Sequence, residues 1–284
     1  MSRRALVAAV LLLFGCAMEP GVSAEGAGEV VSLDAPHAGG GLVTRICRPA
    51  ASGPAPLVII NHGSPVDAQA RAAMKPTPCD RESVRWFTSR GYVAAIPMRR
   101  GYGPTGGEWA ETFGNCTRGN YGPAGLESAR DILAALRAMQ LQPGVVPGPA
   151  LVVGQSAGGW GALALSSLNP PEVRAIVNFA GGRGGWQAGV PNSVCREDRL
   201  VAAAGEYGRT ARIPTLWIYA ANDSFFDHAL ASRLVAAFRA GGGRAEFFAA
   251  PAFRQDGHGF FHGPGGSATW GPRLEDFLSR REGG

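Results

Sequence analysis

Residues 151–158 read Leu-Val-Val-Gly-Gln-Ser-Ala-Gly, and this stretch decides the fold. Its apolar start predicts a buried strand, and the small residues that continue from 157 to 168 predict a helix. Between them, residues 154–158 match the pattern G-x-S-x-G, which forms the sharp strand-to-helix turn known as a nucleophile elbow. A chance glycine-rich turn is the alternative, but the flanking strand and helix favour the elbow. We therefore predict that Ser156 is a nucleophile.

The chain around this stretch alternates short apolar runs with amphipathic segments. Strands are predicted at 57–60, 92–97, 175–179, 215–220 and 244–249, and helices at 80–90, 126–139, 193–207, 228–240 and 274–280. Such alternation implies right-handed crossovers, so we predict an α/β fold with a mostly parallel sheet and helices on both faces. Before it, residues 29–34 and 42–48 predict an antiparallel hairpin at the sheet edge, with its turn at glycines 39–41.

The base that activates the serine is predicted to be His258. A serine hydroxyl needs a general base, and the base needs an orienting acid. Where such an elbow is used, the acid and then the histidine follow the serine along the chain. His258 lies between two glycines just after the last predicted strand. His262 is the runner-up and is more simply a loop histidine, while His228 begins a predicted helix and is expected at the surface.

The orienting acid is predicted to be Asp223. It follows the strand at 215–220, and open α/β sheets place their sites at the carboxyl ends of their strands. Asp227 is the alternative, but it directly precedes a predicted helix and is typical of an N-cap.

An oxyanion hole needs two backbone N–H donors. One is expected from Ala157, directly after the nucleophile, and the other from the loop after the strand at 57–60. In that loop Pro65 has no N–H group, so Ser64 is the candidate. His62 comes too early in the chain to be the base, and we expect it to brace the loop.

We expect no cofactor and no metal. Residues 101–106 match the pattern G-x-G-x-x-G, but no periodic helix follows and Pro104 interrupts the turn, which argues against a dinucleotide site. His258 and His262 with Asp256 could suggest a metal, but their segment is rich in glycine and does not predict the helix that would align them.

The N-terminus predicts a secretory leader over residues 1–24, followed by one domain over 25–284. Arg3 and Arg4 precede an apolar run too short to span a bilayer, and Val22-Ser23-Ala24 forms a cleavage site. A lipoprotein anchored at Cys16 is a lesser alternative. Without the leader the net charge of +5 falls to about +4, since Arg3, Arg4 and Glu19 leave with it. The arginines are scattered, which does not favour a nucleic-acid partner.

The four cysteines outside the leader suit disulfides in an exported protein. Four cysteines allow three pairings. We predict a bridge between Cys79 and Cys116, which flank the strand at 92–97, and this leaves Cys47 and Cys195 as the second pair.

From about residue 56 to 280 the chain resembles the dienelactone-hydrolase-like branch of the α/β-hydrolases. The matching motifs are His62-Gly63-Ser64, Arg100-Gly101-Tyr102-Gly103, Gly154 to Gly159, Asn222-Asp223 and Gly257 to Phe260. Dienelactone hydrolase itself has a cysteine nucleophile, so Ser156 departs from it. The Arg-Gly-x-Gly segment also resembles the prolyl-oligopeptidase relatives, whose N-terminal propeller has no counterpart here. The resemblance implies an α/β-hydrolase fold, and the short stretch from 179 to 215 leaves room for only a minimal lid.

These features predict an exported serine hydrolase of small-molecule esters. The main alternative is a serine peptidase, with Glu108 or Glu111 as an anchor for a peptide, although a solvated loop is the simpler interpretation of both. Trp109, Phe113 and Trp186 could instead give the cleft an aromatic wall, which favours esters. A non-catalytic binding protein on the same scaffold would be expected to lack a member of the serine, acid and histidine set, and the sequence contains all three.

Overall fold

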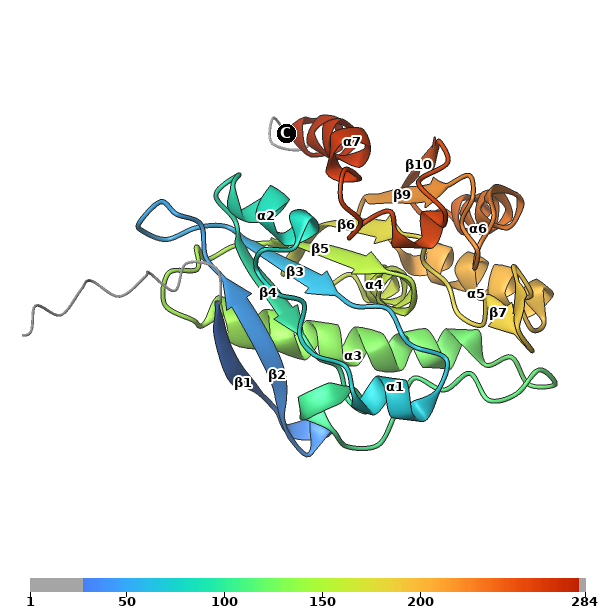
Figure 1. Ribbon diagram of the computed structural model, residues 1–284, viewed down its shortest axis with the longest axis horizontal. Coiled ribbons are helices and arrows are strands. Elements are labelled where there is room, and N and C mark those ends of the chain that lie inside the picture. The colour runs from blue at the N-terminus through green and yellow to red at the C-terminus, as the bar shows by residue number, and fades with distance from the viewer. Residues whose placement is uncertain (1–27, 281–284) are drawn as a thin grey trace, which may run out of the picture.

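The predicted α/β architecture is confirmed by the computed structural model, which describes residues 28–280 (Figure 1). Eight strands form one sheet in the order β1-β2-β4-β3-β5-β6-β9-β10. They are β1 (Glu29–Ala35), β2 (Gly40–Cys47), β3 (Leu57–Asn61), β4 (Val93–Pro97), β5 (Ala150–Gln155), β6 (Val173–Phe179), β9 (Thr215–Ala220) and β10 (Ala245–Ala250). The expected leader, with Cys16, lies outside the described residues.

The sheet is parallel from β4 to β10, and β2 runs antiparallel to both of its neighbours. The predicted edge hairpin is therefore confirmed. Its connection is a short 3-10 turn, η1 (Pro36–Ala38), closed by Gly39 at a φ of 76°, one turn earlier than the glycine triplet suggested. Between β6 and α5 a second, two-stranded sheet pairs β7 (Trp186–Gln187) with β8 (Val190–Pro191), and no larger lid is inserted there.

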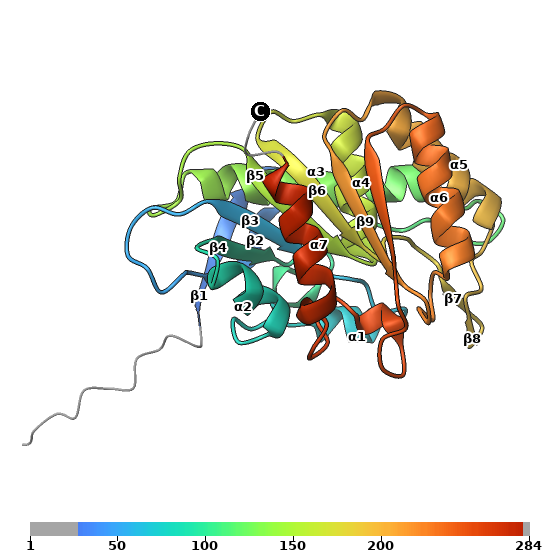
Figure 2. The same ribbon diagram turned by 90° about the horizontal axis from the view of Figure 1, so that it is seen from above.

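Helices cover both faces of the sheet. They are α1 (Ala68–Ala72), α2 (Glu82–Thr88), α3 (Tyr121–Gln140), α4 (Ala157–Leu168), α5 (Glu197–Thr210), α6 (His228–Ala240) and α7 (Ser267–Ser279), with 3-10 turns η2 (Gly103–Thr105) and η3 (Gly257–Gly259). Along β3, Ile59 packs into the core beneath α3 to α6, whereas Val58 and Ile60 pack into the core beneath α2 and α7. Figure 2 shows α2 and α7 on the near face of the sheet.

Two helices begin earlier than their hydrophobic periodicity indicated. Helix α3 starts at Tyr121 instead of 126, because Pro123 falls in its first turn, where a missing N–H costs no helical hydrogen bond. Helix α7 starts at Ser267 instead of 274 and runs through Pro272, after which the sequence had suggested it would begin. Helix α1 has only five residues, and the sequence analysis did not predict it. No helix among residues 28–280 is long and apolar enough to cross a membrane.

The predicted bridge between Cys79 and Cys116 is wrong. The disulfides are Cys47–Cys79 and Cys116–Cys195, with Cα separations of 5.6 and 4.9 Å. Because β2 is antiparallel to β4, Cys47 pairs with Ala94 near the amino end of β4, and Cys79 lies beside it. Cys116 belongs to the loop beyond the carboxyl end of β4, so the length of this strand separates it from Cys79.

Candidate active site

Ser156 occupies the turn between β5 and α4 with φ 54° and ψ −120°, a conformation that non-glycine residues rarely adopt. A Cβ on Gly154 would lie 2.2 Å from the carbonyl oxygen of Gly158, and a Cβ on Gly158 would lie 2.4 Å from that of Asn61. Neither position tolerates a side chain. The strand–turn–helix predicted around Ser156 is therefore present, and the glycines of the pattern are the residues that permit it.

Asp223 and His258 meet at the carboxyl ends of β9 and β10. His258 Nδ1 lies 3.0 and 3.2 Å from the two carboxylate oxygens of Asp223, which is only 2% exposed. Because a carboxylate can only accept hydrogen bonds, Nδ1 carries the proton, and Nε2 is left as the basic nitrogen of the ring. The carboxylate also accepts from the backbone N–H groups of Phe225 and Phe226, at 2.8 and 3.0 Å, so its orientation is fixed.

The imidazole of His258 is held from other directions as well. The ring of Phe225 stacks on it with centroids 4.0 Å apart and an interplanar angle of 26°. The carbonyl of His258 accepts from Gln155 Nε2 at 3.0 Å, and its N–H donates to Asp256 at 2.9 Å. The side chain beside Ser156 in the sequence thus ties the histidine loop to the elbow.

The alternative acid and base residues have other partners. Asp227 caps α6 by accepting from the N–H of Leu230, as its position before a helix indicated. His262 contacts Ser83 at 2.7 Å, and burial lowers the pKa of His262 to about 4. His228 is partly exposed at the start of α6 and contacts the carbonyl of Tyr219 at 2.8 Å.

His62 braces the loop that follows β3, as expected. The backbone N–H of Arg99 donates to His62 Nε2 at 3.2 Å, so the proton must be on Nδ1, which donates to the carbonyl of Gly63 at 2.7 Å. Burial, aided by the charge of Arg99, lowers the pKa of His62 to about 3. The ring is therefore neutral near neutral pH, and it connects the loop after β3 to the start of the loop after β4.

Glu111 is the main feature that the sequence analysis missed. It is 1% exposed instead of solvated, and its carboxylate binds the guanidiniums of Arg99 and Arg183. The hydroxyl of Tyr102 lies 2.8 Å from Glu111 and 2.9 Å from the hydroxyl of Ser64. Burial alone would raise the pKa of Glu111, but the two arginines outweigh it and hold that pKa well below its usual range.

Arg99 extends this cluster to the loop after β3. Its Nη1 donates to the carbonyl of His62 at 2.9 Å. Together with the contact of Tyr102 to Ser64, this bond connects the buried Glu111 carboxylate to the loop that carries Ser64. No local pattern signals the cluster, because Arg183 follows Glu111 by 72 residues in the chain.

A cavity of about 270 Å³ opens beside Ser156. Its lining includes the predicted residues Ser64, Trp109, Ala157 and Trp186, together with Phe113, Phe225, Arg71 and Arg183. Among the described residues, neither Ser64 nor Ala157 gives its backbone N–H to an acceptor within the protein. Within residues 28–280 no aspartate or glutamate lines the cavity, and Glu108 is exposed on its loop.

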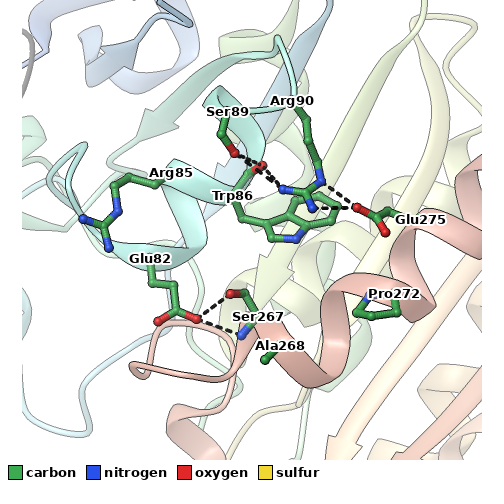
Figure 3. Close-up of a pocket in the computed structure, with 9 residues that line it drawn as sticks. All are labelled: Glu82, Arg85, Trp86, Ser89, Arg90, Ser267, Ala268, Pro272 and Glu275. Atoms are coloured by element: carbon green, nitrogen blue, oxygen red, sulfur yellow. Dashed lines mark hydrogen bonds and ion pairs between the residues drawn. The ribbon is translucent and has the colours of Figure 1, made fainter.

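A larger crevice of about 590 Å³ lies elsewhere, between α2 and α7 (Figure 3). Several of its polar side chains are already paired: Arg90 stacks on Trp86 and binds Glu275 at 2.6 Å, and Glu82 accepts from the N–H of Ser267 at 2.9 Å. The crevice lies between two helices, and Ser156 is not part of its lining. Within residues 28–280 no group of three or more histidine, cysteine, aspartate or glutamate side chains could hold a metal ion, and segment 101–106 forms the turn η2 without opening a helix.

Comparison with known proteins identifies related families and folds. Residues 78–268, more than half of the chain, match the model of the dienelactone hydrolase family. No curated protein matches the chain. Among solved structures, acylaminoacyl peptidase from Pyrococcus horikoshii superposes with a TM-score of 0.64 at 14% identity, over 89% of this chain and 41% of that one. The chain thus spans less than half the length of the peptidase.

Two other solved structures are covered almost completely. A candidate dienelactone hydrolase from Klebsiella pneumoniae has a TM-score of 0.58 and 16% identity, over 88% of this chain and 97% of that one. Est1E from Butyrivibrio proteoclasticus, solved with ferulic acid bound, has a TM-score of 0.58 and 12% identity, over 90% of this chain and 100% of that one. At these identities the similarity establishes a shared fold.

Proposed function

The chain belongs to the dienelactone hydrolase family, and from this premise we propose that it is a serine hydrolase of carboxylic esters. The observation that carries the proposal is the Asp223–His258 pair, with its hydrogen bonds of 3.0 and 3.2 Å, at the same end of the sheet as the strained Ser156. A serine, a histidine and an acid in this chain order are the parts that acyl transfer requires.

In the proposed mechanism Ser156 Oγ attacks the ester carbonyl carbon, and His258 Nε2 takes the proton of the serine hydroxyl. Asp223 keeps the imidazole in the required tautomer and stabilises the cation that forms. The N–H groups of Ser64 and Ala157 bind the oxyanion of the tetrahedral intermediate. When the intermediate collapses, His258 protonates the leaving alcohol. Water then attacks the acyl-enzyme by the same route and releases the acid.

The lining of the cavity supports esters over peptides. A peptidase that holds the amino terminus of its substrate needs a carboxylate in the pocket. Glu108 and Glu111 were the candidates for that role, but Glu108 is exposed on its loop and Glu111 is buried with Arg99 and Arg183. Among residues 28–280, no acid lines the cavity. The acylaminoacyl peptidase neighbour keeps a peptidase as the second candidate. Aromatic side chains from Trp109, Phe113 and Trp186 favour an acyl or aryl group.

We also propose that the protein is exported. Two disulfides are the observation behind this step, since such bonds persist in oxidising compartments. The expected leader at residues 1–24 points the same way.

The decisive experiment compares the wild type with Ser156→Ala on p-nitrophenyl esters and on aminoacyl and dipeptidyl p-nitroanilides. We expect the wild type to prefer esters and to react with a fluorophosphonate probe. Ser156→Ala should lose both, by a factor of about 10⁶ in turnover if the group acts as in other serine hydrolases. Ser52→Ala changes an exposed serine at the opposite end of the sheet and is the matched control.

Three results would contradict the proposal. Turnover retained by Ser156→Ala would remove the nucleophile. An anilide cleaved as efficiently as the best ester would favour the peptidase. A folded wild type that neither reacts with the probe nor cleaves any ester would favour the non-catalytic binding protein.

A further inference from the structure

Arg71 is a buried cation in the wall of the cavity beside Ser156. It lies in α1, is 9% exposed, and places its guanidinium carbon 3.8 Å from the centroid of the Trp109 ring. Its Nη1 donates to the carbonyls of Pro65 and Val66 at 3.3 and 2.9 Å. Stacking and these two bonds fix the plane of the guanidinium.

Most of the hydrogen-bonding capacity of Arg71 is unused. A guanidinium has five N–H donors, and the two on Nη1 bind the two carbonyls. Among residues 28–280 no acceptor is found for the donors on Nε and Nη2, and neither nitrogen is sealed in the interior. The nearest acid in the sequence, Asp67, uses its carboxylate to cap α1 through the N–H of Ala70, at 2.7 Å.

The charge around the cavity is also unbalanced. The second arginine in its lining, Arg183, shares the single carboxylate of Glu111 with Arg99, so that cluster retains one net positive charge. Among residues 28–280, no acidic side chain lines the cavity to offset Arg71. A largely buried guanidinium without a counter-charge is costly unless a partner supplies acceptors, and Arg71 lines the space where a substrate would bind.

We propose that Arg71 forms a subsite for an acceptor oxygen carried by the acyl group of the ester, which rests on the proposed function. The acyl side is chosen because the leaving alcohol must meet His258, and His258 does not line this cavity. The aromatic rings of Trp109 and Trp186 then enclose the carbon chain, and the free edge of Arg71 binds the oxygen beyond it. Both a neutral carbonyl and a carboxylate have this chemistry, and the experiment distinguishes them.

The test uses three p-nitrophenyl esters, each corrected for spontaneous hydrolysis: hexanoate, 5-oxohexanoate and hemiglutarate. Their acyl chains have the same number of heavy atoms in line, and the second and third carry an oxygen on carbon 5. We expect kcat/KM of one or both oxygen-bearing esters to exceed that of hexanoate by about 10- to 100-fold, as a hydrogen bond to a charged group allows. Arg71→Met keeps an apolar stem on Trp109 and should lower the ratio of kcat/KM between the oxygen-bearing esters and hexanoate to about one. The ratio is the readout because Arg71 also binds the carbonyls of Pro65 and Val66, next to Ser64, so the hexanoate rate itself can change. Arg209→Met, on the exposed surface of α5, is the matched control.

The pattern of results identifies the oxygen. A preference for hemiglutarate alone indicates a carboxylate, and a preference for both esters indicates any acceptor. Equal rates on all three esters in the wild type, or an equal loss on all three in Arg71→Met, would overturn the subsite while leaving the esterase proposal intact.

A binding measurement makes the inference independent of catalysis. Ser156→Ala is titrated with monomethyl glutarate and methyl 5-oxohexanoate, which carry the distal oxygen, and with methyl hexanoate, which lacks it. At least one of the first two should quench tryptophan fluorescence saturably, because Trp109 is in contact with Arg71. Ser156→Ala combined with Arg71→Met should not show this preference. If no ester is cleaved and neither oxygen-bearing ligand binds in preference to methyl hexanoate, the inference fails on this measurement alone.

Discussion

Two clusters of side chains near the cavity are held together by different forces. In the cluster that we term the ionic side, made of Arg99, Glu111 and Arg183, one buried carboxylate binds two guanidiniums and supports the loop that carries Ser64. In the cluster that we term the aromatic side, made of Asp223, Phe225 and His258, backbone N–H groups and a stacked ring fix the acid and the imidazole. His258, the residue proposed to take the proton of Ser156, belongs to the aromatic side.

A comparison of two histidines explains this division. His62 lies against Arg99, and burial together with that charge lowers the pKa of His62 to about 3, so its ring binds no proton near neutral pH. A general base works best when its pKa lies near the working pH. His258 has an acid as its partner and an uncharged phenyl ring on its face. A fixed positive charge such as that of Arg99 keeps a neighbouring histidine neutral, which suits a structural role. The same charge beside a general base would weaken its affinity for a proton.

Of the changes within the two sides, the largest effect is expected from the acid of the aromatic side. Asp223→Asn should leave the fold intact but favour the wrong tautomer of His258, with a loss of about 10⁴-fold in kcat by analogy with a serine protease. Asp227→Asn keeps its helix cap, since asparagine caps as well as aspartate, and should change kcat less than about twofold. If the two variants exchange these phenotypes, the acid is Asp227.

The next effect tests the ionic side. Glu111→Gln removes the only carboxylate that Arg99 and Arg183 share and leaves two buried guanidiniums facing each other. We expect the free energy of unfolding in urea to fall by about 3–5 kcal/mol. Glu275→Gln breaks an exposed pair with Arg90 and should cost less than about 1 kcal/mol. Equal losses in the two variants would mean that the cluster adds nothing to the fold.

The disulfide Cys116–Cys195 joins the loop after β4, which carries Trp109 and Glu111, to the segment after the β7–β8 hairpin. Replacing both cysteines with serine should cost about 2–4 kcal/mol of stability and also lower kcat/KM for esters, because the loop that carries Trp109 and Glu111 loses its covalent anchor. The same change at Cys47 and Cys79 should cost a similar amount of stability, yet leave kcat/KM unchanged. If both double variants keep full activity, the Cys116–Cys195 bridge is not needed for the site.

The smallest effect concerns the pH dependence of stability and His62, which lies against Arg99 of the ionic side. The folded-state pKa of His62, about 3, lies below its value of about 6.5 in the unfolded chain, so the unfolded state binds more protons between these limits. Its contribution is complete above pH 6.5 and is lost as the pH falls, by about 2 kcal/mol at pH 5. The free energy of unfolding in urea should fall less between pH 7.5 and pH 5 in His62→Asn than in the wild type. An equal fall in both proteins would contradict the lowered pKa of His62.

Local patterns predicted the fold and the aromatic side. The elbow depends on five consecutive residues, 154–158, and the positions of Asp223 and His258 follow from the strands that precede them. Parallel strands end at one edge, so residues placed after their carboxyl ends meet without further information. The catalytic roles of Asp223 and His258 stay predictions. Their proximity, however, could be predicted from the order of the strands that precede them.

The ionic side and the disulfides depend on contacts that no local pattern encodes. Arg183 reaches Glu111 across 72 residues, and a glutamate in a glycine-rich loop is most simply a solvated one. The cysteine pairing requires knowing that β2 lies beside β4 and in which register. The spacing of the cysteines along the chain predicts neither the neighbour of β2 nor its register.

The backbone at Ser156 has a consequence for how this chain can evolve. A non-glycine residue at φ 54° and ψ −120° costs about 1–3 kcal/mol, which the packing of β5 and α4 must offset. Glycine at this position would relieve the strain, so selection for stability alone would remove the serine. The proposed role of Ser156 as the nucleophile would account for the serine at this strained position. A descendant freed from its chemistry would be expected to lose Ser156 early and to gain thermal stability as it did so.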